Sequence, residues 1–426
     1  MIIYTVKSGD TLFSIASYFG VSVARIKSDN AIKDGERLVV GQALIITLPS
    51  LSYTVKKGDT LSKIASRFSV SENVILQNNP SVITGGIYPG LEITISFRNE
   101  KIREIETNGY AYPHINRFVL EKSLPYLTYL SVFSYGFRES GELIVPDDKV
   151  MLSLAERYNA TPVMVLTTVN ENGVFSSEKA SALFKNKNYR KTVMNNIIQA
   201  MLKKGYRALD VDFEYVSGDE KDEYIDFLSD IAQELHQNGL YLFVALAPKT
   251  YAAQPGLLYE AHDYYEIGKI ADNVLLMTYE WGYTYGPPMA VAPINQVRRV
   301  VEYGVSEIES RKIDMGVPNY AYDWTLPYEK GVSKAQSIGN EKAVSIASEY
   351  GAEIYYDEVA QTPYFEYTKD KKSHVIWFED VRSIEQKLLL ADEFSLSGIG
   401  YWNIMRPFMQ NYMLLAAKYD IKKIKG

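Results

Sequence analysis

The alternation of apolar and polar residues is most regular in the segment LDVDFEY, residues 209–215. Successive side chains of a strand point to opposite faces, so this segment predicts a strand with four bulky apolar groups on one face. The other face would carry three carboxylates, those of Asp210, Asp212 and Glu214. Such an acidic face is tolerated on a solvated edge strand but is costly inside a barrel or cleft. The rest of the pattern decides between these two placements.

Eight short apolar runs follow residue 104, and helical patterns separate several of them. The predicted strands are residues 105–112, 127–134, 162–169, 208–215, 240–248, 273–280, 312–318 and 397–404. Residues 188–206 and 222–239 have helical patterns, and the second ends in Asn-Gly, a common helix stop. This order favours an α/β fold of the (β/α)8 TIM-barrel type. A doubly wound sheet that binds dinucleotides is disfavoured, because no GxGxxG follows a predicted strand.

Polar residues fall at the C-terminal ends of the predicted strands, where TIM barrels place their active sites. Glu214 ends the fourth strand, Tyr279 and Glu280 the sixth and Trp402 the eighth, while Asn170 follows the third. The acids are therefore expected to line the interior. Carboxylates spaced about 7 Å apart along one face cannot all ionise freely in a desolvated site. The outermost, Glu214, is expected to have a raised pKa and to act as a general acid. A cluster neutralised by Lys or Arg, or bound to a divalent cation, is the alternative.

An internal repeat occupies the first 98 residues. YTVKSGDTLFSIASYFGVS (4–22) recurs as YTVKKGDTLSKIASRFSVS (53–71), with 14 of 19 positions identical. Each copy predicts a strand, a turn, two short helices and a closing strand. The Asp and Thr after the turn glycine are expected to open the first helix. This βααβ pattern, with the opening YTVKxGDTL and the helix IA-x-x-F, resembles the LysM family.

The LysM resemblance implies binding of glycans that contain N-acetylglucosamine, chiefly peptidoglycan or chitin. It places the groove between the loop after the first strand and the loop before the last. The groove residues carried over are Gly9, Asp10, Thr11, Asn30, Ala31 and Ile32 in the first copy, and Gly58, Asp59, Thr60, Asn79, Pro80 and Ser81 in the second. A purely structural role in the turn and helix cap is the alternative for the Gly, Asp and Thr. The expected domains are residues 1–49, 50–98 and 99–426, with Ser50–Ser52 as a minimal linker between the two copies. The modules are expected to act independently of the barrel.

Composition and charge remove several classes of function. The chain has 426 residues and a net charge of −7, which argues against a nucleic-acid partner or a membrane surface. It has no cysteine, which excludes disulfides, thiolate catalysis and Cys-ligated zinc. The four histidines lack metal-binding spacing, so neither a metal nor another cofactor is expected. No secretion signal or transmembrane span is expected. The oligomeric state does not follow from the sequence.

Four motifs of the barrel region together resemble glycoside hydrolase family 18. They are D-x-D-x-E on the fourth strand, M-x-Y from Met277 to Tyr279, G-x-P-x-Y from Gly316 to Tyr320, and Trp402 at the end of the eighth strand. The resemblance covers residues 104–426. The segment 361–380 is expected to form a hairpin, a reduced version of the insertion between strands seven and eight that walls a deep chitinase groove.

That resemblance implies retaining hydrolysis in which the N-acetyl group of the substrate is the nucleophile. Glu214 would protonate the leaving oxygen and later activate water. Asp212 would hold the acetamide N–H with support from Asp210, and Tyr279 would donate to the acetamide oxygen. Trp402 would form the floor under the sugar. The remaining expected substrate-binding residues are Glu280, Tyr320, Met277 and Asn170.

Two LysM copies before such a barrel resemble, more closely, the cortex-fragment-lytic N-acetylglucosaminidases of bacterial endospores. The segments RALDVDFEY, MTYEWGYTYGPPMAVAPI and HVIWFED carry this resemblance. It implies cleavage after N-acetylglucosamine in spore-cortex peptidoglycan or its fragments, with the LysM modules as targeting units. It also implies synthesis in the mother-cell cytoplasm without a signal peptide and deposition at the spore coat or cortex. The alternatives are a chitinase acting on chitin oligomers and a non-catalytic glycan-binding or spore-coat protein.

Overall fold

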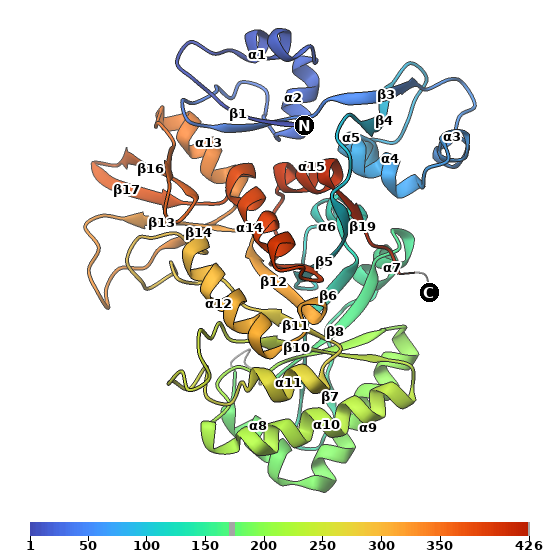
Figure 1. Ribbon diagram of the computed structural model, residues 1–426, viewed down its shortest axis with the longest axis vertical. Coiled ribbons are helices and arrows are strands. Elements are labelled where there is room, and N and C mark those ends of the chain that lie inside the picture. Colours follow the sequence, from blue (N-terminus) through green and yellow to red (C-terminus); the bar gives the residue numbers. More distant parts are fainter. Residues whose placement is uncertain (170–174, 425–426) are drawn as a thin grey trace.

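Eight parallel strands close into a barrel in the computed structural model, which describes residues 1–169 and 175–424 (Figure 1). In order around the barrel they are β5 (Arg103–Ala111), β6 (Tyr129–Phe137), β8 (Thr161–Thr167), β9 (Ala208–Asp212), β10 (Tyr241–Leu246), β11 (Asn273–Leu276), β12 (Ile313–Pro318) and β18 (Gly398–Trp402). The pairing of Tyr401 with Gly109 closes the ring between β18 and β5. The predicted TIM barrel is therefore confirmed.

Helices cover the outside of the barrel. They are α6 (Arg117–Ser123), α7 (Lys149–Arg157), α8 (Ser177–Lys185), α9 (Lys187–Lys204), α10 (Lys221–Gln237), α11 (Tyr264–Ile270), α12 (Ile294–Glu307), α14 (Val381–Glu393) and α15 (Met409–Lys418). The packing of α10 shows how the apolar face of LDVDFEY is used: the ring of Phe213 stacks on Phe227 at 5.7 Å. Phe213 and Val211 are fully buried, so the apolar face points outward to the helices as expected.

An antiparallel sheet is inserted between β12 and β18. It contains β13 (Ala321–Thr325), β14 (Gln336–Ile338), β15 (Tyr355–Asp357), β16 (Thr362–Lys369) and β17 (Lys372–Trp377), with α13 (Asn340–Tyr350) beside it. The hairpin predicted at 361–380 is confirmed as β16 and β17. It is, however, the middle of a five-stranded sheet rather than the whole insertion, because its partners are strands of three to five residues with no clear alternation.

Both N-terminal copies fold as the predicted βααβ units. The first contains β1 (Ile2–Thr5), α1 (Leu12–Phe19), α2 (Val23–Asp29) and β2 (Ala43–Ile46). The second contains β3 (Pro49–Thr54), α3 (Leu61–Phe68), α4 (Glu72–Asn78), the additional turn α5 (Pro80–Gly85) and β4 (Glu92–Phe97). The interpretation of Ser50–Ser52 as a linker is wrong, because these residues lie within β3, where Leu51 and Ser52 pair with β4.

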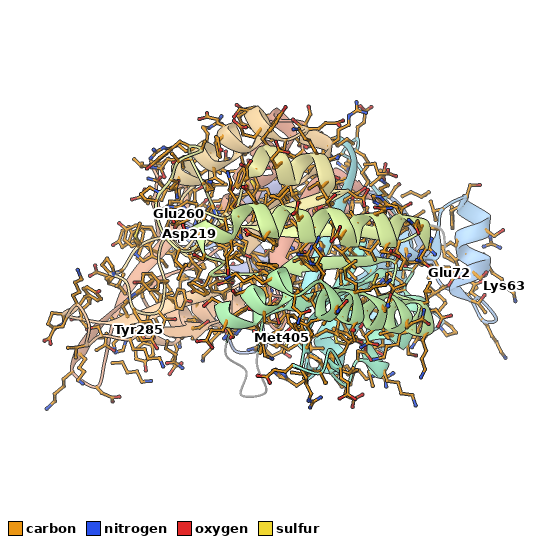
Figure 2. The ribbon with its side chains drawn as sticks, turned by 90° about the horizontal axis from the view of Figure 1, so that it is seen from below. Lys63, Glu72, Asp219, Glu260, Tyr285 and Met405 are labelled. Atoms are coloured by element: carbon orange, nitrogen blue, oxygen red, sulfur yellow. The ribbon has the colours of Figure 1, made fainter. Side chains whose placement is uncertain are left out.

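The two modules pack along the outer side of α15 (Figure 1), and α4 and α5 of the second module also contact the Leu124–Tyr126 turn and α6. The ring of Tyr126, in the 3-10 turn Leu124–Tyr126, stacks on Tyr412 of α15 at 4.7 Å and donates a hydrogen bond to Gln77 O of α4 at 2.8 Å. Buried side chains of α4 and α5 join those of the barrel in one continuous apolar core. Figure 2 shows Lys63 of the second module at the opposite end of the molecule from Tyr285.

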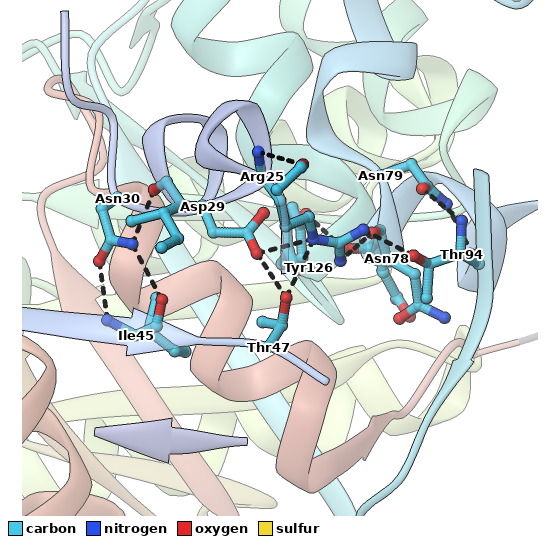
Figure 3. Close-up of polar contacts among 12 residues, drawn as sticks. Arg25, Asp29, Asn30, Ile45, Thr47, Asn78, Asn79, Thr94 and Tyr126 are labelled. Atoms are coloured by element: carbon cyan, nitrogen blue, oxygen red, sulfur yellow. Dashed lines mark hydrogen bonds and ion pairs between the residues drawn. The ribbon is translucent and has the colours of Figure 1, made fainter. Parts of the chain in front are cut away.

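One arginine ties the two modules together (Figure 3). Arg25 of α2 donates to Asp29 Oδ2 at 2.9 Å within its own module. Its guanidinium also donates to Thr94 Oγ1 at 2.6 Å and to Asn78 O at 3.2 Å in the second module. The modules are therefore fixed to each other as well as to the barrel.

Candidate active site

The three carboxylates lie at the C-terminal end of β9, but not all on the strand. β9 ends at Asp212, and Glu214 lies in the turn that follows. Tyr215 has a φ of 60°, a left-handed conformation that is uncommon for a large side chain. The prediction of one strand through residue 215 is therefore wrong at its end, because the chain turns away from the sheet to place Glu214 in the cleft.

Asp210 and Asp212 are buried inside the barrel. Asp210 Oδ2 accepts a hydrogen bond from Tyr110 OH at 2.6 Å, and burial raises the pKa of Asp210 to about 6. Burial raises the pKa of Asp212 further, and the negative charges of Glu214 and Asp210 add to the effect. One oxygen of each aspartate is buried without a partner among the described residues. Unpartnered oxygens in a desolvated site are ready to accept a ligand N–H or to hold a proton.

Glu214 is partly exposed at the mouth of the barrel. Burial, and then the negative charge of Glu280, raise the pKa of Glu214 above its ordinary value, as the sequence analysis expected. Glu280 has a φ of 69° and accepts hydrogen bonds from the hydroxyls of Tyr320 and Tyr322. Tyr320 and Glu280 are thus brought together as a pair. Burial raises the pKa of Glu280 as well, while the hydrogen bonds from the two tyrosines lower it. A carboxyl group with a raised pKa beside a second carboxyl group is suited to donate a proton.

An aromatic wall borders the carboxylates. Trp402, at the end of β18, contacts the rings of Phe133 at 4.9 Å and Tyr110 at 6.0 Å. Met277 packs in the same apolar cluster. Burial raises the pKa of the Tyr279 hydroxyl, and the negative charges of Asp212 and Glu214 add to the effect. The structure therefore gathers these residues around the acids, whereas Asn170 lies outside the described residues.

Two hollows extend from this centre and share Glu280. One, of about 260 Å³, is lined by Trp402, Tyr112 and Tyr320. The other, of about 690 Å³, begins at Glu214 and Tyr279. An extended chain lying through both would cross the barrel mouth over the carboxylates. Openings of this size suit one or more sugar units.

Three residues of the site are absent from the sequence prediction. Tyr110 holds Asp210, Tyr322 holds Glu280, and His262 contacts the turn that carries Glu214. His262 Nδ1 accepts a hydrogen bond from Ala247 N at 2.8 Å, so its proton is on Nε2, which lies 3.3 Å from Phe213 O. Burial lowers the pKa of His262 to about 4, which keeps the ring neutral. The position of Tyr110 at the end of the first strand was an available signal, but nothing local marks His262.

The alternatives for the acid cluster find no support among the described residues. None of the ion pairs between them involves Asp210, Asp212 or Glu214. The described part of the chain contains no group of three or more His, Asp or Glu side chains arranged to hold a metal ion.

No helix in the described ranges is both long and apolar enough to cross a membrane.

The LysM candidate residues divide into exposed turns and buried supports. Asp10 Oδ2 accepts from Tyr4 OH at 2.7 Å and from Lys7 N at 2.8 Å, and Asp59 makes the matching contacts in the second module. Thr11 and Thr60 cap α1 and α3. Gly9 and Gly58 have φ of 88° and 87°, which a side chain would disfavour. These residues build the turns, and their binding to glycan stays a prediction.

The asparagines of the predicted grooves are buried supports. Asn30 donates to Ile26 O and Ile45 O, accepts from Ile45 N at 2.7 Å, and also accepts from Gln410 of α15 at 3.0 Å. Asn79 bonds Ile75 and Thr94 in the same way. With every polar atom used inside the protein, neither side chain is available to a sugar.

The remaining LysM candidates border two different spaces. Ala31 and Ile32 line a small cavity of about 30 Å³ between the first module and the barrel. Pro80 and Ser81 line a cleft of about 420 Å³ between the two modules, where Ser81 is exposed. The two repeats therefore present different surroundings at equivalent positions.

Comparison with known proteins agrees with this architecture. The profile of Glycosyl hydrolases family 18 matches residues 120–406, and that of the LysM domain matches residues 4–47 and 53–96. The cortical fragment-lytic enzyme of Bacillus subtilis (strain 168) is 40% identical over 99% of both chains. The crystal structure of the Bacillus megaterium QM B1551 spore cortex-lytic enzyme SleL is 39% identical and covers 99% of both chains, with a TM-score of 0.84.

A more distant structure shows the fold alone. A chitinase from Chromobacterium violaceum ATCC 12472 is 21% identical, with a TM-score of 0.68 over 74% of this chain and 98% of that chain. The profile match, the full-length identity and the carboxylates at the barrel mouth agree. The chain therefore belongs to glycosyl hydrolase family 18, as a glycoside hydrolase with two LysM domains in front of its barrel.

Proposed function

We propose that the protein hydrolyses peptidoglycan of the spore cortex, or fragments of it, at the bond after N-acetylglucosamine. The observation that carries the proposal is the Asp210–Asp212–Glu214 series at the barrel mouth, in a chain that matches a cortical fragment-lytic enzyme from end to end. The same relatives support an association with spores. Deposition at the coat or cortex is part of the proposal.

The chemical step begins with the proton on Glu214. Glu214 donates it to the glycosidic oxygen as the carbonyl oxygen of the substrate's acetamide attacks the anomeric carbon, which gives an oxazolinium intermediate and a free leaving sugar. Asp212 accepts the acetamide N–H through its unpartnered oxygen and stabilises the positive charge. Tyr279 donates to the acetamide oxygen. Glu214, now ionised, takes a proton from the attacking water, and the configuration is retained.

The neighbours of these groups hold them in place. Tyr110 orients Asp210. Burial, the charge of Glu214 and then the charge of Asp210 raise the pKa of Asp212. His262 Nε2–H donates to Phe213 O and fixes the turn that carries Glu214. Trp402 provides the apolar floor for the sugar whose bond is cleaved. The two tyrosines on Glu280 keep that carboxylate beside Glu214.

The LysM modules serve, in this proposal, to hold the enzyme on glycan strands. Their exposed turns around Gly9 and Gly58 are the binding surfaces, because Asn30 and Asn79 are committed to the fold. Two modules on one chain raise the effective concentration of enzyme at insoluble peptidoglycan.

The test is mass spectrometry of cortex peptidoglycan fragments incubated with the wild type and with Glu214→Gln. New reducing-end N-acetylglucosamine in the wild type alone is the expected result. A new muramic acid end would refute the bond assignment. Products from the Glu214→Gln variant at the wild-type rate would refute the acid assignment.

A chitinase is the second candidate, because solved chitinases share the barrel fold. Incubation of the wild type with chitin oligomers discriminates: release from these oligomers without any new ends on cortex fragments would favour the chitinase. Binding to both substrates without any product would favour a non-catalytic glycan-binding or spore-coat protein.

A further inference from the structure

The larger hollow lies on the leaving-group side of Glu214. Trp402, the floor for the sugar that is attacked, lines only the smaller hollow, whereas Glu214 and Tyr215 line only the larger one. Tyr279, which holds the acetamide of the attacked sugar, also lines the larger hollow, so the catalytic end of this hollow receives that acetamide. Because the proton donor lies between the two sugars of the cleaved bond, the leaving sugar occupies the rest of the larger hollow, beyond Glu214. This assignment rests on the proposed function.

The walls of the larger hollow are aromatic. Tyr215, Tyr251 and Tyr283 each expose more than two fifths of their surface, at 43%, 52% and 42%. Large aromatic faces left open inside a concave surface suit stacking against sugar rings. The two carboxylates, Glu214 and Glu280, lie at the end that adjoins the catalytic centre.

The only basic residue among the described residues that line this hollow is Arg299, in the second turn of α12. Its guanidinium forms no ion pair with the described residues, and its one hydrogen bond among them is a long one, which Nη1 donates to Gln296 Oε1 at 3.4 Å. The adjacent Arg298 differs: it is turned away from the hollow and forms a two-pronged ion pair with Glu393 at 2.6 and 2.7 Å. Arg299 is thus a cation without an anion in the wall of a sugar-sized hollow.

We propose that Arg299 recognises a carboxylate carried by the 3-O substituent of the leaving sugar. In the proposed substrate the leaving sugar is N-acetylmuramic acid, whose lactyl group ends in a carboxylate, and a peptide attached there also carries carboxylates. A guanidinium pairs with a carboxylate through two parallel hydrogen bonds. A chitin oligomer places a neutral sugar in the same hollow. Arg299 therefore selects acidic leaving groups while Glu214 and Asp212 perform the chemistry.

The charges at the two ends of the larger hollow should orient the leaving sugar. The catalytic end of the hollow is negative, so a second negative group on the substrate is repelled there and attracted toward Arg299. This orients the leaving sugar with its acidic substituent toward α12. Because Arg299 is exposed, salt screens the attraction, and the preference weakens as the ionic strength rises.

The experiment compares kcat/KM of the full-length wild type, Arg299→Gln and Arg299→Lys on three tetrasaccharides. These are a peptidoglycan tetrasaccharide with free lactyl carboxylates, the same sugar with its peptides attached, and the free-carboxylate sugar after amidation. Arg298→Gln is the matched control, since it removes an equal charge one residue away. We expect Arg299→Gln to lose about fivefold on the acidic substrates, as a solvent-exposed ion pair predicts, and less than twofold on the amidated one. Arg299→Lys is expected to retain part of the preference.

The outcomes separate this inference from the proposed function. Equal loss on acidic and amidated sugars, or an equal effect of Arg298→Gln, would overturn the role of Arg299. Loss confined to the peptide-bearing sugar would assign the contact to a peptide carboxylate, and loss confined to the free acid would assign it to the lactyl group. If the wild type releases no reducing-end N-acetylglucosamine from any of the sugars, the proposed function itself fails.

Discussion

At the scale of the residue, the three acids of the site are chemically alike but lie in different surroundings. Asp210 accepts a hydrogen bond from the hydroxyl of Tyr110, Asp212 lies near two other carboxylates, and Glu214 lies near Glu280. Each of these arrangements follows from a strand that ends two residues before Glu214. In the proposed mechanism, depth in the barrel therefore decides which acid is the buried support, which binds the acetamide and which donates the proton.

The charge of Glu280 is one cause of the raised pKa of Glu214, so its removal has a predictable effect. Glu280→Gln should lower the pKa of Glu214, and the alkaline limb of kcat/KM should move to lower pH, because the donor loses its proton earlier. The pH profile on a soluble fragment is the measurement. Glu280→Asp keeps the charge and is the control. A limb that moves equally in both variants would contradict this electrostatic cause.

Asp210 should make stability depend on pH. Its pKa is about 6 in the fold against an ordinary value of 3.8, so its contribution is fully present below 3.8 and is lost as the pH rises through 6. The loss is at most about 3 kcal/mol at 1.36 kcal/mol per pKa unit. The Asp210→Asn variant has no carboxyl at this position and does not lose this stability. The free energy of unfolding of the variant minus that of the wild type should therefore increase between pH 4 and pH 7.

Urea unfolding at both pH values measures that difference. Asp420 is exposed, so Asp420→Asn is the control for removal of a carboxylate. The stability of this control variant should change with pH as that of the wild type does. A constant difference between Asp210→Asn and the wild type across the range would contradict the raised pKa.

The sequence predicted the residues that react in the proposed mechanism, but not the residues that hold them in place. The alternation in LDVDFEY and the strand ends were sufficient to bring Glu214, Asp212, Tyr279 and Trp402 into one interior. Tyr322 and His262 come from the inserted sheet and from the loop before α11, and their contacts depend on how distant segments pack. No periodicity along the chain encodes such contacts, which is why the supports appear only in the structure.

At the scale of the element, strand identity was predictable and strand ends were not. The eight barrel strands lie where apolar runs are, but β9 and β11 end three and four residues before the predicted ends, at Asp212 and Leu276. Beyond those points the chain carries Glu214 and Glu280, and the left-handed backbone at Tyr215 and Glu280 is set by the site. Local propensity favours strand there, and the tertiary structure overrides it.

The repeat gives a matched pair of glycines to test how the first module is held. Gly41 and Gly90 are equivalent positions with φ of 83° and 91°, so alanine is strained at both. A Cβ on Gly41 would lie 1.8 Å from Ile354 O of the inserted segment, whereas a Cβ on Gly90 meets nothing within 4 Å. Gly41→Ala should therefore destabilise the protein by about 1–3 kcal/mol more than Gly90→Ala.

Chemical denaturation of the two variants measures this difference. Equal destabilisation would mean that the first module is not held against the inserted segment at Gly41. Hydrogen exchange at Ile354 N, which donates to Val40 O at 3.0 Å, reports the same contact independently: its protection should fall in Gly41→Ala and not in Gly90→Ala.

At the scale of the whole molecule, the modules and the barrel behave as one body. Tandem repeats before a barrel suggested independent modules, and the structure contradicts this. Ile75 and Ile83 of the second module belong to the same buried core as Leu124, Tyr126 and the side chains between the barrel strands and the surrounding helices. The expectation of independence failed because the shared core forms between segments whose sequences show only that each has an apolar face.

Removal of the modules should therefore cost the barrel stability as well as glycan binding. A chain without residues 1–98 exposes Tyr126 and Tyr412, whereas a chain without residues 1–48 keeps α4 and α5 over them. The first chain is expected to melt at a clearly lower temperature than the second, because burial of each large side chain is worth about 2 kcal/mol. It should also lose hydrolysis of short soluble fragments on warming. Thermal melts by circular dichroism, with initial rates at two temperatures, measure both effects. If both shortened chains melted at the same temperature as the full-length protein, the shared core would contribute nothing to the stability of the barrel. The modules would then serve binding alone.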